Sequence, residues 1–360
     1  MSTANNAVNN AVNNASTVKP KSPWKSSPKD RAKEAAIFLG TITATCLVVL
    51  YSPLSGKLGL FVTFFFLYAL AQATMSYRKF GSMSAKDSAI KVIMACGAVL
   101  AVIPIVSILG TVFVKGLPGI KWNIFTNDMS LATTTDPLTS GGLLHAIVGT
   151  LLLVLGALIL SVPIGILTAL YLTEIRGRFS RPIRFLVQAM SGVPSIVAGL
   201  FVLSAVVYTI TKSTSGFAGA LALTILMIPT VARTSEEVLK LIPEDLREAG
   251  TALGGTQWRT VAMIVIPAAK SGLMTAVILG VARIAGETAP LLLITGGGDT
   301  LNFNLFDDPM GSLPFYIWKS FLAGSEEANT RAWAGLLILI ILVLFLFTTA
   351  RFLSTRKVAR

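Results

Sequence analysis

The feature that most constrains this chain is a series of long apolar runs separated by short basic loops. Runs of 18 residues or more recur along the sequence, and a helix of about 20 residues crosses the ~30 Å hydrocarbon core of a bilayer. Only 13% of the residues are charged, against about 25% in soluble domains. We therefore predict an all-α membrane protein, a polytopic helical bundle, with eight spans at residues 35–51, 58–76, 92–114, 142–172, 185–211, 217–232, 268–294 and 332–352.

The distribution of Lys and Arg predicts the orientation of these spans. With the N-terminus inside, 23 of the 30 basic residues lie in the inner segments 1–34, 77–91, 173–184, 233–270 and 351–360. Because cytoplasmic loops hold the excess of Lys and Arg, both termini are predicted to be cytoplasmic. The net charge of +13 is spread between apolar runs and not gathered on one module, which favours membrane lipid and not nucleic acid as the surroundings of the chain.

Residues 1–34 differ from the rest of the chain. An Asn-Asn-Ala-Val unit repeats from Asn5, and a segment rich in Lys, Pro and Ser follows it. Neither part has an apolar period or the apolar core of a cleavable signal peptide, so we predict a disordered cytoplasmic tail. Two spans within residues 35–80 follow this tail, ahead of the remaining six.

Several kinds of chemistry are excluded by the residues present. The two cysteines, Cys46 and Cys96, lie in apolar runs, and His145 is the only histidine. These residues form no disulfide framework, metal-ligand spacing or histidine-based triad. The phosphate-binding pattern G-x-x-x-x-G-K-[ST] is absent from the sequence. The chain is therefore predicted to be no enzyme, to need no cofactor and to hydrolyse no ATP itself.

Proline and glycine mark expected irregularities. Prolines inside the predicted spans, at positions 104, 163, 194 and 229, predict kinks, which neighbouring helices tolerate. The glycines at 296–298 are expected to form a turn. The aromatic stretch from Pro314 to Trp318 suits a short helix at the outer interface. His145 is expected to be a packed or capping side chain.

The segment 233–270 is too polar to span a membrane, yet it is regularly patterned. Apolar residues at helical spacing predict a helix from Glu244 to Leu253, which Gly254 and Gly255 end. A second helix is predicted from Thr256 to about Ile266, before Pro267. The two short helices would form a compact knob. On pattern alone, an ordinary helical loop without a special role is equally compatible.

This knob resembles the cytoplasmic signature loop of ABC importer permeases, whose pattern is Glu-Ala-Ala, three residues, Gly, nine residues, Ile-x-Leu-Pro. The matching positions here are Glu248, Ala249, Gly254, Ile264 and Pro267. Gly250 replaces the second Ala, and Ile266 replaces Leu. The resemblance implies that the loop docks on a separate ATPase subunit and transmits its closure. Under that role, the glycine at 254 is expected to let the two short helices approach closely.

A second pattern is Ala-Arg-Ile-Ala-Gly-Glu-Thr-Ala-Pro over residues 282–290. The predicted span 268–294 places Arg283 near mid-membrane, where an arginine costs at least ~2.5–3.5 kcal/mol. Glu287 follows one helical turn later. The pair is therefore expected either to bind a solute or to neutralise itself inside the bundle. Both can hold in turn, with the pair closed at rest and opened by an anion.

The same segment, with Ser191–Phe201, Gly141–Leu152 and Ile228–Glu237, closely resembles the PstA-type permease family of phosphate-specific ABC importers. The resemblance implies a six-helix permease core, here 81–360, preceded by two extra helices within 35–80. It implies a translocation path that includes Arg283, Glu287 and Arg233. It also implies four partners: a homologous PstC-type permease, a PstB-type ATPase dimer, a periplasmic PstS-type phosphate-binding protein and phosphate, at the bacterial inner membrane.

Physical chemistry agrees with a phosphate path. A guanidinium stays charged and offers a planar fork of donors to an oxyanion. A carboxylate at Glu287 repels an anion unless that anion donates a proton, as hydrogen phosphate does and sulfate does not. Two other functions stay open: an ABC permease for sulfate or molybdate, and an ion-driven secondary transporter. The latter would need a second charged repeat, and none is visible.

Overall fold

The structure is a computed structural model that describes residues 28–51 and 56–355. The predicted tail up to residue 27 lies outside the described residues. Helix α2 (Pro28–Tyr51) begins before the first predicted span. Within the described residues the elements are helices, and Gly296 and Met310 form an isolated β-bridge. The all-α prediction is confirmed. The chain divides into two compact units, residues 1–107 and 108–360.

The first unit contains α2, α3 (Lys57–Phe80) and most of α4 (Ser82–Gly116). Aromatic rings join α2 to α3: the Phe38 ring lies 5.6 Å from that of Phe64 and 5.9 Å from that of Tyr68, both edge-on. Edge-to-face contacts of this kind stabilise a helix pair where lipid provides little driving force. Each of the three helices is long and apolar enough to cross a membrane.

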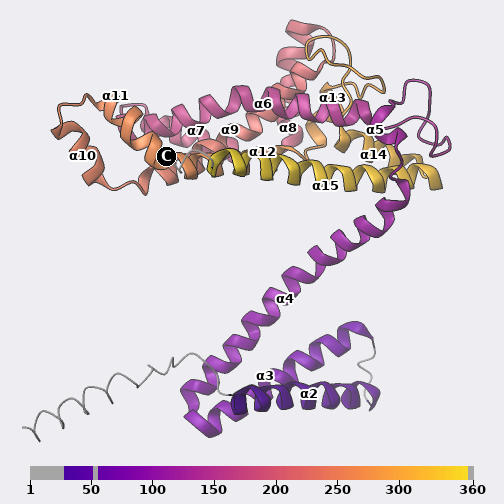
Figure 1. The fold of residues 1–360 in the computed structure, drawn as a ribbon, viewed down its shortest axis with the longest axis vertical. Coiled ribbons are helices and arrows are strands. Elements are labelled where there is room, and N and C mark those ends of the chain that lie inside the picture. Colours follow the sequence, from indigo (N-terminus) through magenta and orange to yellow (C-terminus); the bar gives the residue numbers. More distant parts are fainter. Residues whose placement is uncertain (1–27, 52–55, 356–360) are drawn as a thin grey trace, which may run out of the picture. The chain divides into compact units, whose positions relative to one another are not determined.

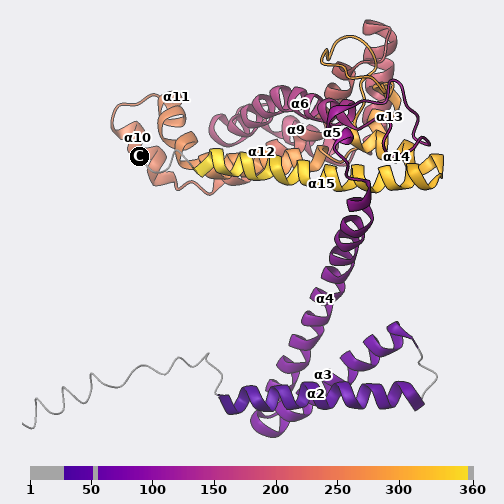
Figure 2. The ribbon, with the colours of Figure 1, turned by 45° about the vertical axis from the view of Figure 1, so that its right-hand side comes forward.

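The second unit is a bundle in which α6, α9, α12 and α15 lie side by side (Figure 1). Figure 2 shows α10 and α11 at one end of these helices and α5 and α14 at the other. Its elements are η1 (Leu117–Gly119), α5 (Asn123–Thr126), α6 (Leu144–Leu170), η2 (Tyr171–Ile175), α7 (Ser180–Ser191), α8 (Ser195–Val202), η3 (Leu203–Thr211), α9 (Gly216–Lys240), α10 (Glu244–Ala252), α11 (Gln257–Thr260), η4 (Val261–Val265), α12 (Ile266–Ile284), α13 (Ala289–Ile294), α14 (Leu313–Ala323) and α15 (Glu326–Thr355).

Helix α9 is the centre of this bundle. Small residues bring its neighbours close, because a Cβ placed on Gly165 of α6 would lie 2.8 Å from Val231. A Cβ on Gly280 of α12 would lie 2.7 Å from Met227. Close backbone approach of this kind is how membrane helices gain packing energy without a hydrophobic driving force. Met227 and Val231 are fully buried in the main apolar cluster.

The number of spans depends on one bent pair of helices. Seven helices of the described residues are long and apolar enough to cross a membrane, and there are eight if the pair α7 and α8–η3 counts as one. The predicted span 185–211 is interrupted at its predicted kink: α7 and α8–η3 meet at 106° across residues 192–194. Pro194 explains the break, because its ring disfavours helical backbone at Val193 and removes a donor. The prolines at 104, 163 and 229 lie inside continuous helices.

Two further predicted boundaries are wrong. Helix α9 continues to Lys240, so Arg233 lies within a helix and not at its end. Helix α12 ends at Ile284, so the predicted span 268–294 is broken at residues 285–288 before α13 begins. Pro290 suits the first turn of α13, where its missing donor is not needed.

The predicted second loop helix is also not separate from the span that follows it. Helices α11, η4 and α12 form one stretch from Gln257 to Ile284 that is long enough to cross a membrane. Pro267 lies in the first turn of α12, directly after the π-helical turn η4. A π turn has a wider helical ring, which accommodates the local disruption that proline introduces.

Candidate functional site

The predicted knob is formed by α10, residues 253–256 and α11. The first predicted helix, Glu244–Leu253, is confirmed within one residue. Glu248, Ala249 and Gly254 are all exposed on it. Exposure is what a docking role requires of these three residues. Docking on an ATPase subunit stays a prediction.

Gly254 is required for a different reason from the one predicted. A Cβ at this position would meet nothing within 4 Å, so the glycine does not allow the helices to approach. Its φ is +80°, in the left-handed region that side chains with a Cβ disfavour. The Gly254 N–H donates to the Thr251 carbonyl, and the chain reverses there. Gly254 therefore ends α10 by its backbone conformation.

The close approach lies at Gly250 instead. A Cβ there would lie 2.7 Å from Thr260 Cγ2 and 2.8 Å from Ile264 Cδ1. Gly250 is buried against α11 and η4, and Ile264 is half-buried beside it. Glycine in place of the second Ala of the signature pattern thus leaves the space that the Thr260 and Ile264 side chains occupy. Ile264 has a packing role, whereas Pro267 is exposed.

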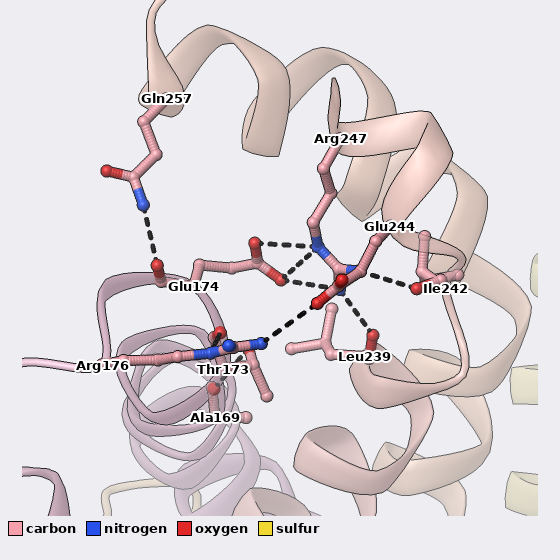
Figure 3. Close-up of polar contacts among 9 residues, drawn as sticks. All are labelled: Ala169, Thr173, Glu174, Arg176, Leu239, Ile242, Glu244, Arg247 and Gln257. Carbon is pink, nitrogen blue, oxygen red and sulfur yellow. Dashed lines mark hydrogen bonds and ion pairs between the residues drawn. The ribbon is translucent and has the colours of Figure 1, made fainter. Parts of the chain in front are cut away.

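The knob is held to the bundle by Arg247, a residue that the sequence analysis did not select (Figure 3). Its Nε and Nη2 donate to the Glu174 carboxylate at 3.1 and 3.0 Å. Its Nη1 donates to the Ile242 carbonyl at 2.7 Å, and its Nη2 also donates to the Leu239 carbonyl at 2.9 Å. One guanidinium therefore joins α10 to the end of α9 and to η2, the continuation of α6.

Other polar contacts surround this pair. Gln257 of α11 donates to the Glu174 backbone carbonyl at 2.7 Å. The groups around Arg247 and Glu174 line an open cavity of about 500 Å³. Nearby, the buried Glu236 of α9 pairs with Arg184 of α7 at 2.8 Å and with Lys240 at 2.7 Å. The sequence feature that could have selected Glu174 is its position as an isolated acid at the end of a long apolar run, where a charge without a partner is costly.

Arg283 and Glu287 form an ion pair, as their spacing suggested, but the helix does not continue between them. Arg283 lies in the last turn of α12, and Glu287 lies in the non-helical break before α13. The Nη1 of Arg283 donates to the Glu287 carboxylate. The arginine side chain is 47% exposed and the glutamate side chain 13%. A half-exposed guanidinium beside a helix break keeps donors free for an anion.

The break brings two of the sequence segments together. Helix α8 packs on α13, and a Cβ on Gly199 would lie 2.7 Å from Pro290 Cα. Val193, at the bend between α7 and α8, packs on the apolar cluster that contains Ile284 and Leu291. The two interrupted helices are therefore neighbours. Interrupted helices are a recurring feature of binding sites inside membranes.

Arg233 lies on α9, exposed, and has no ion-pair or hydrogen-bond partner among the described residues. Helices α9 and α12 are antiparallel, since Gly280 lies against Val231 and Gly272 lies against Val238. Counting along α12 from these contacts, Arg233 lies about 10 Å nearer the knob than Arg283 does. The structure thus places the two arginines at different levels of one helix pair and not side by side.

The opposite end of the unit is tied by polar contacts between two loops. Asp128 accepts hydrogen bonds from the Ser130 hydroxyl at 2.6 Å and the Leu301 N–H at 3.1 Å. The Ser130 hydroxyl, more than any other contact, lowers the pKa of the Asp128 carboxyl. The buried Arg331 donates from one Nη atom to three carbonyls of the first loop, those of Asp136, Pro137 and Ser140.

Three smaller predictions concern this end. His145 is buried with its ring edge-on to Tyr316 at 5.7 Å, as a packed histidine should be. The glycine turn is confirmed, with positive φ at Gly296 and Gly297. The aromatic stretch begins a helix, α14. In the described part of the chain, no three His, Cys, Asp or Glu side chains gather closely enough to hold a metal ion.

Comparisons with known proteins agree with this arrangement. The family described as "Binding-protein-dependent transport system inner membrane component" matches residues 161–358. The "Phosphate transport system permease protein PstA" of Mycobacterium leprae is 40% identical, over 72% of this chain and 86% of that protein. PstA 1 of Mycobacterium tuberculosis is also 40% identical, over the same shares. PstA of Haemophilus influenzae is 42% identical, over 67% of this chain and 84% of its own. The chain therefore belongs to the PstA family of multi-pass ABC transporter permease subunits.

Proposed function

We propose that this chain forms half of the translocation path of an ATP-driven importer of inorganic phosphate. The observation that supports this most strongly is the similarity to proteins named as phosphate transport permeases, at about 40% identity over most of their length. The Arg283–Glu287 pair at a helix break supports it independently, because it combines an oxyanion-binding fork with a proton acceptor.

In the proposed path, phosphate opens the Arg283–Glu287 pair and replaces the carboxylate on the guanidinium. Glu287 then accepts a hydrogen bond from the protonated oxygen of hydrogen phosphate. Arg233, about 10 Å nearer the knob along the same helix pair, offers a second cation for the departing anion. Both arginines are exposed within the chain, so a homologous partner is required to close the path around them.

The proposed assembly has one PstC-type permease, two PstB-type ATPase subunits and a periplasmic PstS-type phosphate-binding protein. The exposed knob with Glu248, Ala249 and Gly254 docks on an ATPase subunit, which hydrolyses the ATP. The knob and both termini are cytoplasmic, in agreement with the excess of Lys and Arg in those segments. Six spans from residue 81 onward form the permease core, and the two helices within 35–80 are additional.

The test is ATP-dependent phosphate uptake into proteoliposomes that hold the full complex. We expect wild-type uptake that excess sulfate does not reduce, and we expect Arg283→Gln to lose uptake while assembly stays normal. Arg178→Gln is the matched control, since Arg178 is exposed and outside the candidate spans. Uptake of sulfate or molybdate in place of phosphate would contradict the substrate. Equal activity of Arg283→Gln would make the pair a structural ion bridge.

A further inference from the structure

Arg247 has more bonding partners than an ordinary surface arginine of a loop helix. Its guanidinium contacts both oxygens of Glu174, which is 73 residues earlier in the chain, and two carbonyls at the end of α9 (Figure 3). Those carbonyls belong to the last turn of α9 and the turn after it, where a helix leaves acceptors without intrahelical partners. The Leu239 carbonyl also accepts from the Ile242 N–H, at 3.3 Å. The side chain therefore caps α9 while it binds the continuation of α6.

Burial separates this pair from a nearby surface pair. The Arg247 side chain is 20% exposed and that of Glu174 is 7%. The neighbouring pair, Arg176 and Glu244, is 3.8 Å apart, with side chains 69% and 74% exposed. Exposed pairs contribute little, whereas the loss of one partner of a buried pair leaves a desolvated charge. Of these two ion pairs between the end of α6 and α10, Arg247–Glu174 is the buried one.

The covalent connection of α10 to the bundle is short and apolar by comparison. Helix α9 ends at Lys240 and α10 begins at Glu244, so only residues 241–243 join them. On its other side, α10 packs through Gly250 on Thr260 and Ile264. Without Arg247, a displacement of α10 would reach α9 through a three-residue turn, and its direct polar link to the end of α6 would be the exposed Arg176–Glu244 pair.

We infer that Arg247 is a positioning residue for coupling: with Glu174 it makes the knob move as one body with the ends of α6 and α9. A displacement imposed on α10 by an ATPase subunit is then passed to two spanning helices at once. Because α9 also packs against α12, the same movement reaches the helix that ends in Arg283. This inference rests on the proposed function, and it assigns the transmission step to a pair outside the signature pattern.

The test compares phosphate uptake and ATP hydrolysis in the same proteoliposomes with the full complex. The variants are Glu174→Gln, Arg247→Gln, the double variant and Arg247→Lys; Arg176→Gln is the control from the same turn. We expect uptake per ATP hydrolysed to fall about tenfold in each Gln variant while hydrolysis continues. The double variant should be no worse than either single variant, because the two residues act as one unit. Arg247→Lys should recover only part, since lysine cannot bridge three acceptors in a plane.

Two results would overturn the inference. One is an unchanged ratio of uptake to hydrolysis in Glu174→Gln and Arg247→Gln. The other is an equal fall of uptake and ATP hydrolysis together with loss of assembled complex, which would show a purely structural role. Glu174→Gln is the variant least expected to disturb assembly, because it keeps the side-chain shape and the backbone carbonyl that accepts from Gln257. Wild type is measured first. If the wild-type complex takes up no phosphate, the proposed function is contradicted. If the wild type and the variants take up the same amount of phosphate per ATP hydrolysed, only the role of Arg247 is contradicted.

Discussion

Single residues of the second unit have distinct physical tasks. Arg283 and Glu287 lie where α12 ends, and their ion pair leaves the guanidinium half exposed. In the loops at the end of the unit opposite to the knob, Asp128 accepts three hydrogen bonds, from the Ser130 hydroxyl and the N–H groups of Ser130 and Leu301. In the proposed function the Glu287 carboxylate exchanges its partner for an anion, whereas the Asp128 carboxylate joins two loops.

Selectivity against sulfate is predicted to depend on the charge of Glu287. In Glu287→Gln the side-chain amide can donate to either anion, so the repulsion that excludes a fully deprotonated anion is lost. We expect excess sulfate to inhibit phosphate uptake by this variant and not by wild type. Competition assays in proteoliposomes measure this. If the variant rejects sulfate as well as wild type does, selection lies elsewhere in the complex.

The Asp128 contacts predict a pH dependence of stability. Because its folded pKa is lowered, this carboxylate stabilises the fold above the unfolded pKa of about 3.9, and the contribution is lost as pH falls through the folded pKa. Asp128→Asn should therefore lower the unfolding temperature at pH 7, and the difference from wild type should shrink as the pH falls below the unfolded pKa of about 3.9. Thermal unfolding in detergent tests this, with the exposed Asp87→Asn as control. A difference that does not change with pH would contradict the assignment.

At the scale of elements, the breaks in the helices organise the molecule. The bend at residues 192–194 and the break at residues 285–288 place α8 against α13, with Gly199 on Pro290. The knob depends on a similar contact between α10 and η4. Gly250 provides the space there, and the positive φ of Gly254 provides the reversal.

The two glycines of the knob are predicted to respond differently to substitution. Gly250→Leu would force α10 away from Thr260 and Ile264, so we expect loss of coupled uptake. Gly254→Asn should keep most of the uptake, because asparagine tolerates the left-handed region. Gly254→Val should be worse than Gly254→Asn, because a β-branched residue is strained there. Equal effects of Asn and Val at position 254 would show that the side chain, and not the backbone, decides.

At the scale of the whole molecule, the family match lies in only one of the two units of the chain. The match covers residues 161–358, within the second unit. The helices α2 and α3 precede it and join each other by aromatic contacts of their own. Because two spans return the chain to the same side of a membrane, their removal preserves the orientation of everything that follows.

Deletion of residues 1–80 is therefore predicted to leave phosphate uptake intact. Deletion of residues 1–55 removes α2 alone and leaves an odd number of spans, which conflicts with the Lys and Arg in the later loops. We expect the shorter deletion to be the more harmful one. Uptake and membrane insertion of the two variants can be compared directly. Loss of uptake in the longer deletion, with normal insertion, would show that α2 and α3 take part in transport or its regulation.

The sequence by itself determined the features that depend on local patterns. Apolar runs predicted the helical membrane class, the pattern around Glu248 predicted the knob, and the four-residue spacing predicted the Arg283–Glu287 contact. The first two succeed because hydrophobic periodicity is a local property. The third holds although α12 ends at Ile284, because the turn that follows keeps two residues only four apart within reach of each other. The end of α9 was placed too early because polar residues can continue a helix when tertiary contacts satisfy them. Glu236, paired with Arg184 and Lys240, is an example. The end of α12 was placed too late because apolar composition alone does not show where a helix breaks.

Only the tertiary structure decided which distant residues meet. Arg247 pairs with Glu174 because the bundle brings the end of α6 beside α10, and no local rule specifies that neighbour. In the same way, the value of glycine at position 250 depends on Thr260 and Ile264, and that at Gly199 depends on Pro290. Long-range packing selects these contacts, since burial requires a partner for each charge and space for each backbone approach.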